Sequence, residues 1–190
     1  MHNLLEYRRE RLPAKLVLTV AVLLSLAATA VSEVTAPADF FGNVMLAVLL
    51  VSQFRLWDDL NDIEADRIEH PNRVLCRLAS LRPFQVTVAM LLAVNSFAIF
   101  VSRAFITGAV FVALNIAFYC WYHKLRTLCR PSVNSFFVLT KYPVFAFVIT
   151  DGAIISHRMS VSLMMITIFV AACVYEILHN IRTFRKSNHT

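Results

Sequence analysis

Six long apolar runs constrain this chain more than any other feature of its sequence. They cover residues 16–32, 40–57, 83–101, 104–122, 132–155 and 160–178. Each is close to the roughly 20 residues that an α-helix needs to cross the hydrocarbon core of a bilayer. Because 58% of the 190 residues are hydrophobic and only 16% are charged, the composition lies outside the range of ordinary soluble domains. The sequence predicts an all-α integral membrane protein, a single helical domain over residues 1–190 with about six spans.

The Lys and Arg residues are distributed unevenly among the loops, and this predicts the orientation. Fifteen of the 18 lie before the first run, between the last residues of the second run and the start of the third, between the fourth and fifth, or after the sixth. Arg103 and Arg158 lie in the other loops, and Lys141 falls inside the fifth run. Basic loops stay in the cytoplasm. We expect a multi-pass protein, in a bacterial inner membrane, with both termini cytoplasmic; nucleic acid is not the expected partner of its net charge of +6.

The first apolar run has two interpretations. Its small residues Ala27, Ala28 and Ala30 are compatible with a signal-peptide cleavage site. The segment before it is long, however, and contains Glu6 and Glu10, which signal peptides lack at that position. We therefore expect an uncleaved first span.

An acidic stretch directly follows the second apolar run. Asp58, Asp62 and Asp66 have the i, i+4, i+8 spacing that places side chains on one face of a helix, and Asp59 lies beside them. Carboxylates so placed repel one another, and the helix dipole disfavours negative charge at the C-terminal end of a helix. We therefore expect a cationic partner. Mg²⁺ is suitable, because it takes oxygen ligands from carboxylates, water and phosphate.

The acidic stretch could instead be a solvated, salt-bridged cytoplasmic helix without a ligand. Its apolar positions, Leu60, Ile63 and Ile68, continue a helical stripe and favour an ordered helix over a loose linker. Pro71 should end that helix, because the residue before a proline avoids the helical conformation. Arg73 would then lie close to the carboxylates.

Lys141 is the basic residue that is hardest to explain by orientation alone. It lies about nine residues into the fifth run, roughly 14 Å along a helix, which is too deep for its ammonium group to reach the interface comfortably. Ionisable groups at such depth face a cavity or a partner. We expect Lys141 to do one of these, with Glu176 in the sixth run as a candidate partner.

The acidic stretch resembles the first Asp-rich motif of the UbiA-type intramembrane prenyltransferases, commonly NDxxDxxxD followed by a Pro and an Arg. The matching positions are Asp59, Asp62 and Asp66, with Asp58 in place of the Asn, and then Pro71 and Arg73. The same residues also fit the DDxxD pattern of soluble isoprenyl diphosphate synthases, but six membrane spans argue against that fold. The resemblance covers about the first two-thirds of the UbiA fold.

The resemblance implies a UbiA-like helical bundle and a membrane-bound prenyltransferase. Such a protein binds an isoprenoid diphosphate through Mg²⁺ and transfers the prenyl group to an aromatic or lipid acceptor. The implied ligands are Asp58, Asp59, Asp62 and Asp66 for the metal, and Arg73, Lys124, Arg126 and Lys141 for the diphosphate. Ordinary anchoring at the membrane interface explains Lys124 and Arg126 equally well. Aromatic residues of the spans could line a tunnel for the prenyl chain, although lipid contact is the commoner use of such residues. They include Phe54, Trp57, Phe111, Phe118, Tyr119, Trp121, Phe137, Tyr142, Phe145 and Phe147.

UbiA-type enzymes usually have about nine spans and a second Asp-rich motif, which faces the first. In this sequence, residues 175–182 lie where the approach to that motif would be, and Glu176 is their one acidic residue. We therefore expect a shortened relative, a truncated product, or one subunit of a homo- or hetero-oligomer that supplies the second motif. The alternative function is that of a non-catalytic membrane protein that retains a diphosphate or anionic-lipid site.

Overall fold

The structure, a computed structural model, describes residues 2–32, 36–129, 131–151 and 158–187. Within these ranges the chain is helical and has no β-strand. Six of the described helical segments are long and apolar enough to cross a membrane: Ala14–Val31, Pro37–Asn61, Arg82–Ser102, Phe105–Leu128, Val133–Thr150 and Met159–Leu178. The all-α architecture is confirmed for these residues, and the six long apolar helices match the predicted number of spans and are compatible with a multi-pass membrane protein.

Shorter helices extend or connect these spans. In chain order the described elements are α1 (His2–Arg11), α2 (Ala14–Ser32), α3 (Pro37–Asn61), α4 (Ile63–Glu69), α5 (Val74–Arg77), α6 (Arg82–Ser102), α7 (Phe105–Cys120), the π-helical turn η1 (Trp121–Leu125), the 3₁₀ turn η2 (Arg126–Leu128), α8 (Pro131–Leu139), α9 (Lys141–Thr150) and α11 (Arg158–Ser187). Most boundaries lie within four residues of the predicted ones. Residues 152–155 of the predicted fifth span lie outside the described residues.

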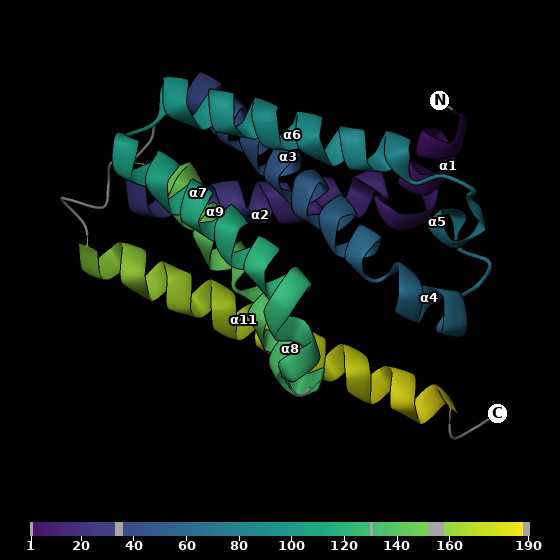
Figure 1. Cartoon of the computed structure of the whole chain (residues 1–190). Helices are drawn as coiled ribbons and strands as arrows, with labels where there is room; N and C mark the ends of the chain where they lie inside the picture. The colour runs from purple at the N-terminus through teal and green to yellow at the C-terminus, as the bar shows by residue number, and fades with distance from the viewer. Residues whose placement is uncertain (1, 33–35, 130, 152–157, 188–190) are drawn as a thin grey trace.

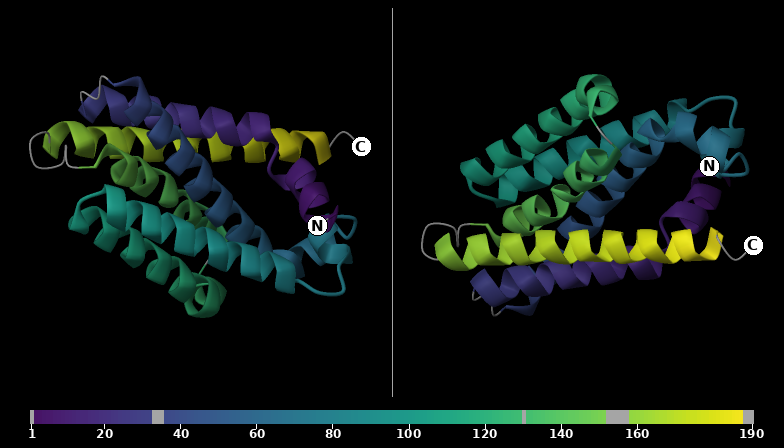
Figure 2. Two further views of the ribbon diagram at one scale, coloured as in Figure 1. Left: turned by 90° about the horizontal axis from the view of Figure 1, so that it is seen from above. Right: turned by 90° about the horizontal axis from the view of Figure 1, so that it is seen from below.

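Helix α3 occupies the middle of the bundle. It packs between α2 and α6, while α9 packs against α2, α3, α7 and α11. The short helices α1, α4 and α5 lie at the end of the bundle where α11 finishes, as both Figure 1 and Figure 2 show. We call this end, which carries the residues from Asp58 to Asp66, the aspartate end.

Small residues allow the central helices to approach closely. Ala21 and Ala28 of α2, Ala47 of α3 and Ala146 of α9 are all completely buried in the main apolar core. Such residues let helix backbones pack tightly in a membrane, where apolar side chains gain little from leaving lipid. The alanines therefore take the place of the glycines that are scarce in this sequence, which has only 3.

The fifth span is not the single helix that hydropathy predicts. It consists of α8 and α9, which are separated at Thr140, where the backbone N–H of Thr140 donates to the carbonyl of Phe137 at 3.0 Å. The cause is Pro143, which has no N–H to donate to the carbonyl of Leu139 and whose ring would clash with it. Proline is tolerated in the first turn of α9, so the chain starts a new helix at Lys141.

The acidic stretch is also divided between two helices. Helix α3 ends at Asn61 and α4 begins at Ile63, although the backbone hydrogen bonds from Asp62 to Asp58 (3.0 Å) and from Asp66 to Asp62 (2.8 Å) continue through the junction. The four aspartates thus stay roughly on one face, as predicted. Helix α4 ends at Glu69, before Pro71, also as predicted.

A second, smaller apolar cluster holds α1 against the aspartate end. It contains Tyr7 from α1, Leu56 from α3, Ile63 from α4, and Val74 and Phe84 from the chain that follows. The rings of Tyr7 and Phe84 meet edge to face with centroids 5.4 Å apart. This packing places the polar side chains of α1 beside the aspartates.

Three buried amide side chains connect α3, α6 and α7 in the membrane interior. Asn95 donates to Gln53 at 2.8 Å, Gln53 donates to Asn115 at 2.8 Å, and Asn115 donates to the carbonyl of Phe111 at 2.8 Å. Because no water is available in the bilayer core, each bond satisfies a group that would otherwise be unpaired. The chain of bonds fixes the relative positions of the three helices.

We expect replacement of Gln53 by leucine to lower the free energy of unfolding by about 1–3 kcal/mol, because it leaves amide groups of Asn95 and Asn115 buried without partners. Unfolding of the purified protein in mixed micelles would measure the loss. The matched control is Gln85→Leu, since Gln85 is exposed on α6 and should change stability by less than about 0.5 kcal/mol. Equal effects of the two substitutions would contradict a structural role for the amide chain.

Candidate functional site

At the aspartate end, each of the four aspartates lies against a basic side chain. The pairs are Asp58 with Lys141, Asp59 with Arg11, Asp62 with Arg126, and Asp66 with Arg73. We call these eight residues the charge network. Its basic members come from α1, η2, α9 and the loop before α5, so distant parts of the chain meet at one end of the bundle.

The pair of Asp58 and Lys141 is the most deeply buried part of the charge network. Their side chains are only 8% and 5% exposed. One carboxylate oxygen of Asp58 accepts from the Lys141 ammonium and the other accepts from the hydroxyl of Tyr122. Lys141 is thus paired, as its depth predicts. Its partner is Asp58 and not the candidate Glu176, because the helix break at Thr140 makes Lys141 the first residue of α9, where it faces α3.

Asp59 is held by residues that sequence reasoning did not connect with it. Its carboxylate accepts from the Tyr7 hydroxyl at 2.7 Å and from two nitrogens of Arg11 at 2.5 and 3.2 Å, and Arg55 lies 3.6 Å away. Burial, with Asp59 beside it, raises the pKa of Tyr7, so this hydroxyl remains a donor. Tyr7 and Arg11 are four residues apart on α1, the spacing of neighbours on one helix face. In the sequence, this spacing was the signal that Tyr7 and Arg11 could contact the same group.

The remaining two pairs lie nearer the surface. Arg126 lies 2.5 Å from Asp62 with both side chains about one-third exposed, and Arg73 contacts Asp66. Partial burial raises the pKa of Asp62 above its usual value, although Arg126 opposes this shift. The chain reverses at Pro71 and brings Arg73 back over α4, as the sequence predicts.

A cluster of aromatic rings lies directly on the membrane side of Asp58. Phe54 is its centre, with ring centroids 5.2 Å from Phe118, 5.1 Å from Phe145 and 5.7 Å from Trp57. Tyr122 joins the cluster through Trp57 at 6.0 Å and connects it to the charge network. We call these five residues the aromatic cluster. Phe54, Phe118 and Phe145 are completely buried, so in this structure the cluster is a packed core and not an open tunnel.

Three of the four predicted diphosphate ligands belong to the charge network. Arg73, Arg126 and Lys141 each pair with a different predicted metal ligand. Lys124, in η1, is exposed, and no ion pair within the described part of the chain includes it. Its side chain is therefore available to an external anion.

The carboxylates have the chemistry of a Mg²⁺ site but not its arrangement. Oxygen ligands suit this cation. Each aspartate is nevertheless paired with a protein cation, and across the described ranges no three His, Cys, Asp or Glu side chains converge as a set of metal ligands. In this arrangement the four aspartates do not fit a metal ion. Mg²⁺ binding remains a prediction that requires at least one basic side chain to leave its aspartate.

Comparison with known proteins adds no family assignment. No family model matches the sequence, and neither a curated protein nor a solved structure is significantly similar to it. The fold and the site define a helical chain with six potential membrane spans and a charge network at one end.

We expect Lys141→Met to destabilise the protein by about 3–5 kcal/mol, because the carboxylate of Asp58 is then buried without a cation. The double variant Lys141→Met with Asp58→Asn should recover a large part of this loss, since neither charge remains. Unfolding in mixed micelles completes the double-mutant cycle. Lys124→Met, a control at an exposed position, should stay within about 0.5 kcal/mol of the wild type. Additive effects of the two buried substitutions would exclude the pair.

The raised pKa of Asp62 predicts a pH dependence of stability. Because its pKa in the folded state lies above that in the unfolded state, the folded protein holds more protons between the two values. Stability from this group should therefore fall as the pH rises through that interval. The substitution Asp62→Asn removes this titration, and Arg126 stays charged throughout. The wild type should lose stability relative to Asp62→Asn as the pH rises above about 4, the ordinary pKa of an aspartate. A difference that grows in the opposite direction would contradict the shift.

Proposed function

We propose that this chain is a membrane-bound prenyltransferase-like protein of the UbiA type. It binds an isoprenoid diphosphate at the charge network and transfers the prenyl group to an aromatic or lipid acceptor. The observation that carries the proposal is the meeting of three predicted diphosphate ligands with the predicted metal ligands, directly beside the aromatic cluster.

An isoprenoid diphosphate is an amphiphile whose two parts match these two clusters. Its diphosphate carries several negative charges, and charge-assisted hydrogen bonds from Arg and Lys are the strong contacts for such a group. Its chain is apolar, and the faces of aromatic rings favour a cation such as the one that forms when an allylic diphosphate ionises. Because Phe54, Phe118 and Phe145 are packed against one another, the chain would enter by separating these rings.

The diphosphate must compete with the aspartates for their basic partners. The pair of Asp62 and Arg126 is the easiest to open, because both side chains are about one-third exposed and exposed pairs contribute little. Lys124 lies two residues before Arg126 and is exposed. These two basic residues are therefore the first contacts for a diphosphate, and the buried pair of Asp58 and Lys141 is the last to yield.

The location follows from the distribution of basic loops. Besides Arg73 itself, fourteen Lys and Arg residues lie at or beyond the same ends of the spans as Arg73. Since basic loops stay in the cytoplasm, this distribution favours a cytoplasmic aspartate end in a bacterial inner membrane. A second copy of this chain, or a different subunit, would supply the second Asp-rich motif that UbiA-type enzymes use.

A second candidate function is binding without catalysis. The observation in its favour is the complete pairing of the four aspartates, which gives a stable network without a metal. Such a protein would hold a diphosphate or an anionic lipid headgroup through Lys124 and Arg126 and would release no product.

We expect Mg²⁺ to strengthen the binding of geranylgeranyl or farnesyl diphosphate by at least about tenfold, and Asp62→Ala to abolish this strengthening. The reason is that Asp62 is the aspartate whose basic partner leaves most readily. Titrations of the purified protein with Mg²⁺ and with EDTA provide the ratio of dissociation constants. Glu64→Ala is the matched control, because Glu64 is an exposed carboxylate in the first turn of α4, two residues after Asp62, and should leave the ratio unchanged. The same ratio in Asp62→Ala as in the wild type would refute the proposed site.

Release of inorganic diphosphate separates the two candidate functions. Turnover with a panel of prenyl diphosphates that disappears in Asp66→Ala would support the transferase. Mg²⁺-dependent binding without release, for every donor and acceptor offered, would leave the binding protein as the function.

A further inference from the structure

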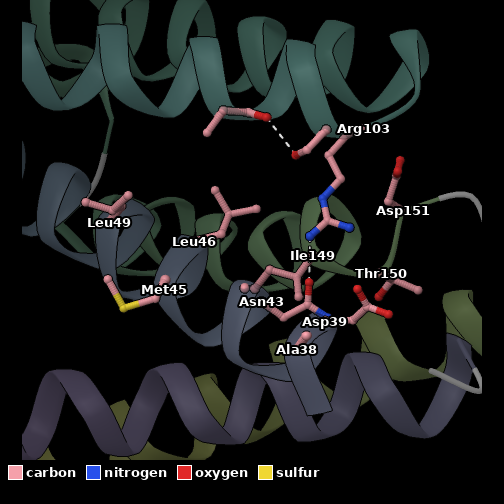
Figure 3. Close-up of a pocket in the computed structure, with 13 residues that line it drawn as sticks. Ala38, Asp39, Asn43, Met45, Leu46, Leu49, Arg103, Ile149, Thr150 and Asp151 are labelled. Carbon is pink, nitrogen blue, oxygen red and sulfur yellow. Dashed lines mark hydrogen bonds between the residues drawn. The ribbon is translucent and has the colours of Figure 1, made fainter. Parts of the chain in front are cut away.

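A pocket of about 510 Å³ lies between α3, α6 and α9 at the end of the bundle opposite the charge network. Figure 3 shows residues that line it, and Asp39, Asn43 and Arg103 are polar members of this lining. Asn43 is fifteen residues before Asp58 on α3, which corresponds to about 22 Å along the helix. The pocket is therefore distinct from the charge network, and its volume is in the range of small-ligand sites.

Arg103 brings a positive charge into this pocket and forms no ion pair with another described residue. Its side chain reaches from the end of α6 towards α3 and donates to the amide oxygen of Asn43 at 2.5 Å (Figure 3). The Nε atom is buried and makes no hydrogen bond. No ion pair joins Arg103 to Asp39 or Asp151, the two carboxylates that line the same pocket, and all three residues are in the described part of the chain. A buried donor requires an acceptor, and an anionic acceptor would also balance the positive charge of the guanidinium.

The carboxylates of Asp151 and Asp39 differ in their availability to a ligand. Asp151 caps α7, because it accepts from the backbone N–H of Ala104 at 3.0 Å and from the Thr107 hydroxyl at 2.7 Å. Asp39 is exposed, and it lies one helical turn from Asn43 on the same face of α3. Since Arg103 contacts Asn43, a carboxylate and a guanidinium line the same pocket about one helical turn apart along α3.

Apolar side chains form the wall of the pocket that continues into the membrane. They are Met45, Leu46 and Leu49 on α3, Ala98 on α6 and Ile149 on α9. A ligand whose polar group lies between Arg103 and Asp39 would thus lay a hydrocarbon chain along this wall.

We propose that this pocket binds a zwitterionic phospholipid whose phosphate contacts Arg103 and whose ammonium group contacts Asp39. A short spacer such as ethanolamine joins two opposite charges in one headgroup, and the pocket is lined by two opposite charges. An anionic lipid such as phosphatidylglycerol would satisfy Arg103 but would offer no positive group to Asp39. The site does not depend on the proposed function, because it uses none of the residues of the charge network.

Lipid retention by the purified full-length protein tests this assignment. Native mass spectrometry would compare phosphatidylethanolamine with phosphatidylglycerol of the same acyl chains, each added in equal excess. We expect the wild type to retain at least about tenfold more phosphatidylethanolamine, and Arg103→Gln to reduce retention of both lipids by a similar factor. Arg82→Gln is the matched control, because Arg82 is exposed at the other end of α6 and should retain lipid as the wild type does.

Two further variants keep the test decisive if Arg103→Gln does not fold. Asp39→Asn changes an exposed side chain and should remove the preference for phosphatidylethanolamine while phosphatidylglycerol is still retained. Ala98→Phe should fill the apolar wall and reduce retention of both lipids. Equal retention of the two lipids by the wild type, or unchanged preference in Asp39→Asn, would overturn the proposal.

Discussion

A carboxylate buried in a helical bundle costs several kcal/mol unless a cation lies against it. Asp58 meets this condition through Lys141, and Lys141 meets the corresponding condition for an ammonium group through Asp58. Neither side chain can move far without exposing the other to an apolar environment. The relative positions of α3 and α9 are therefore fixed at this point, and Tyr122 ties α7 and η1 to the same carboxylate. The other pairs of the charge network are arranged around this contact.

The two ends of the bundle handle charge in different ways. At the aspartate end, basic and acidic side chains neutralise each other within the protein, so an incoming ligand must displace an existing partner. At the opposite end, the partner of Arg103 among the described residues is the neutral amide of Asn43, so a ligand can approach this charge without displacing a described acidic side chain. The first arrangement suits a ligand that brings strong charge of its own. The second suits one that is abundant in the membrane and binds without competition.

Hydropathy predicted the spans well because the bilayer requires apolar runs of a minimum length, and Pro71 predicted the end of α4. Hydropathy does not report helix continuity, so the break at Thr140 was missed, although Pro143 was visible as its cause. The pairing of Arg11 with Asp59 joins residues 48 positions apart. One sequence cannot show which helices are neighbours, and the partner of Lys141 was misplaced for the same reason.

Because the chain is synthesised from its N-terminus, the two buried aspartates gain their basic partners at different times. Arg11 is made before Asp59, so that carboxylate emerges from the ribosome with its guanidinium partner already present. Asp58 must wait for 83 further residues until Lys141 appears. A newly inserted second span thus carries one satisfied and one unsatisfied carboxylate at its end. Until the fifth span is inserted, the unpaired carboxylate of Asp58 is more stable at the hydrated membrane interface than in the apolar interior. Pairing with Lys141 then allows this end of the second span to become buried.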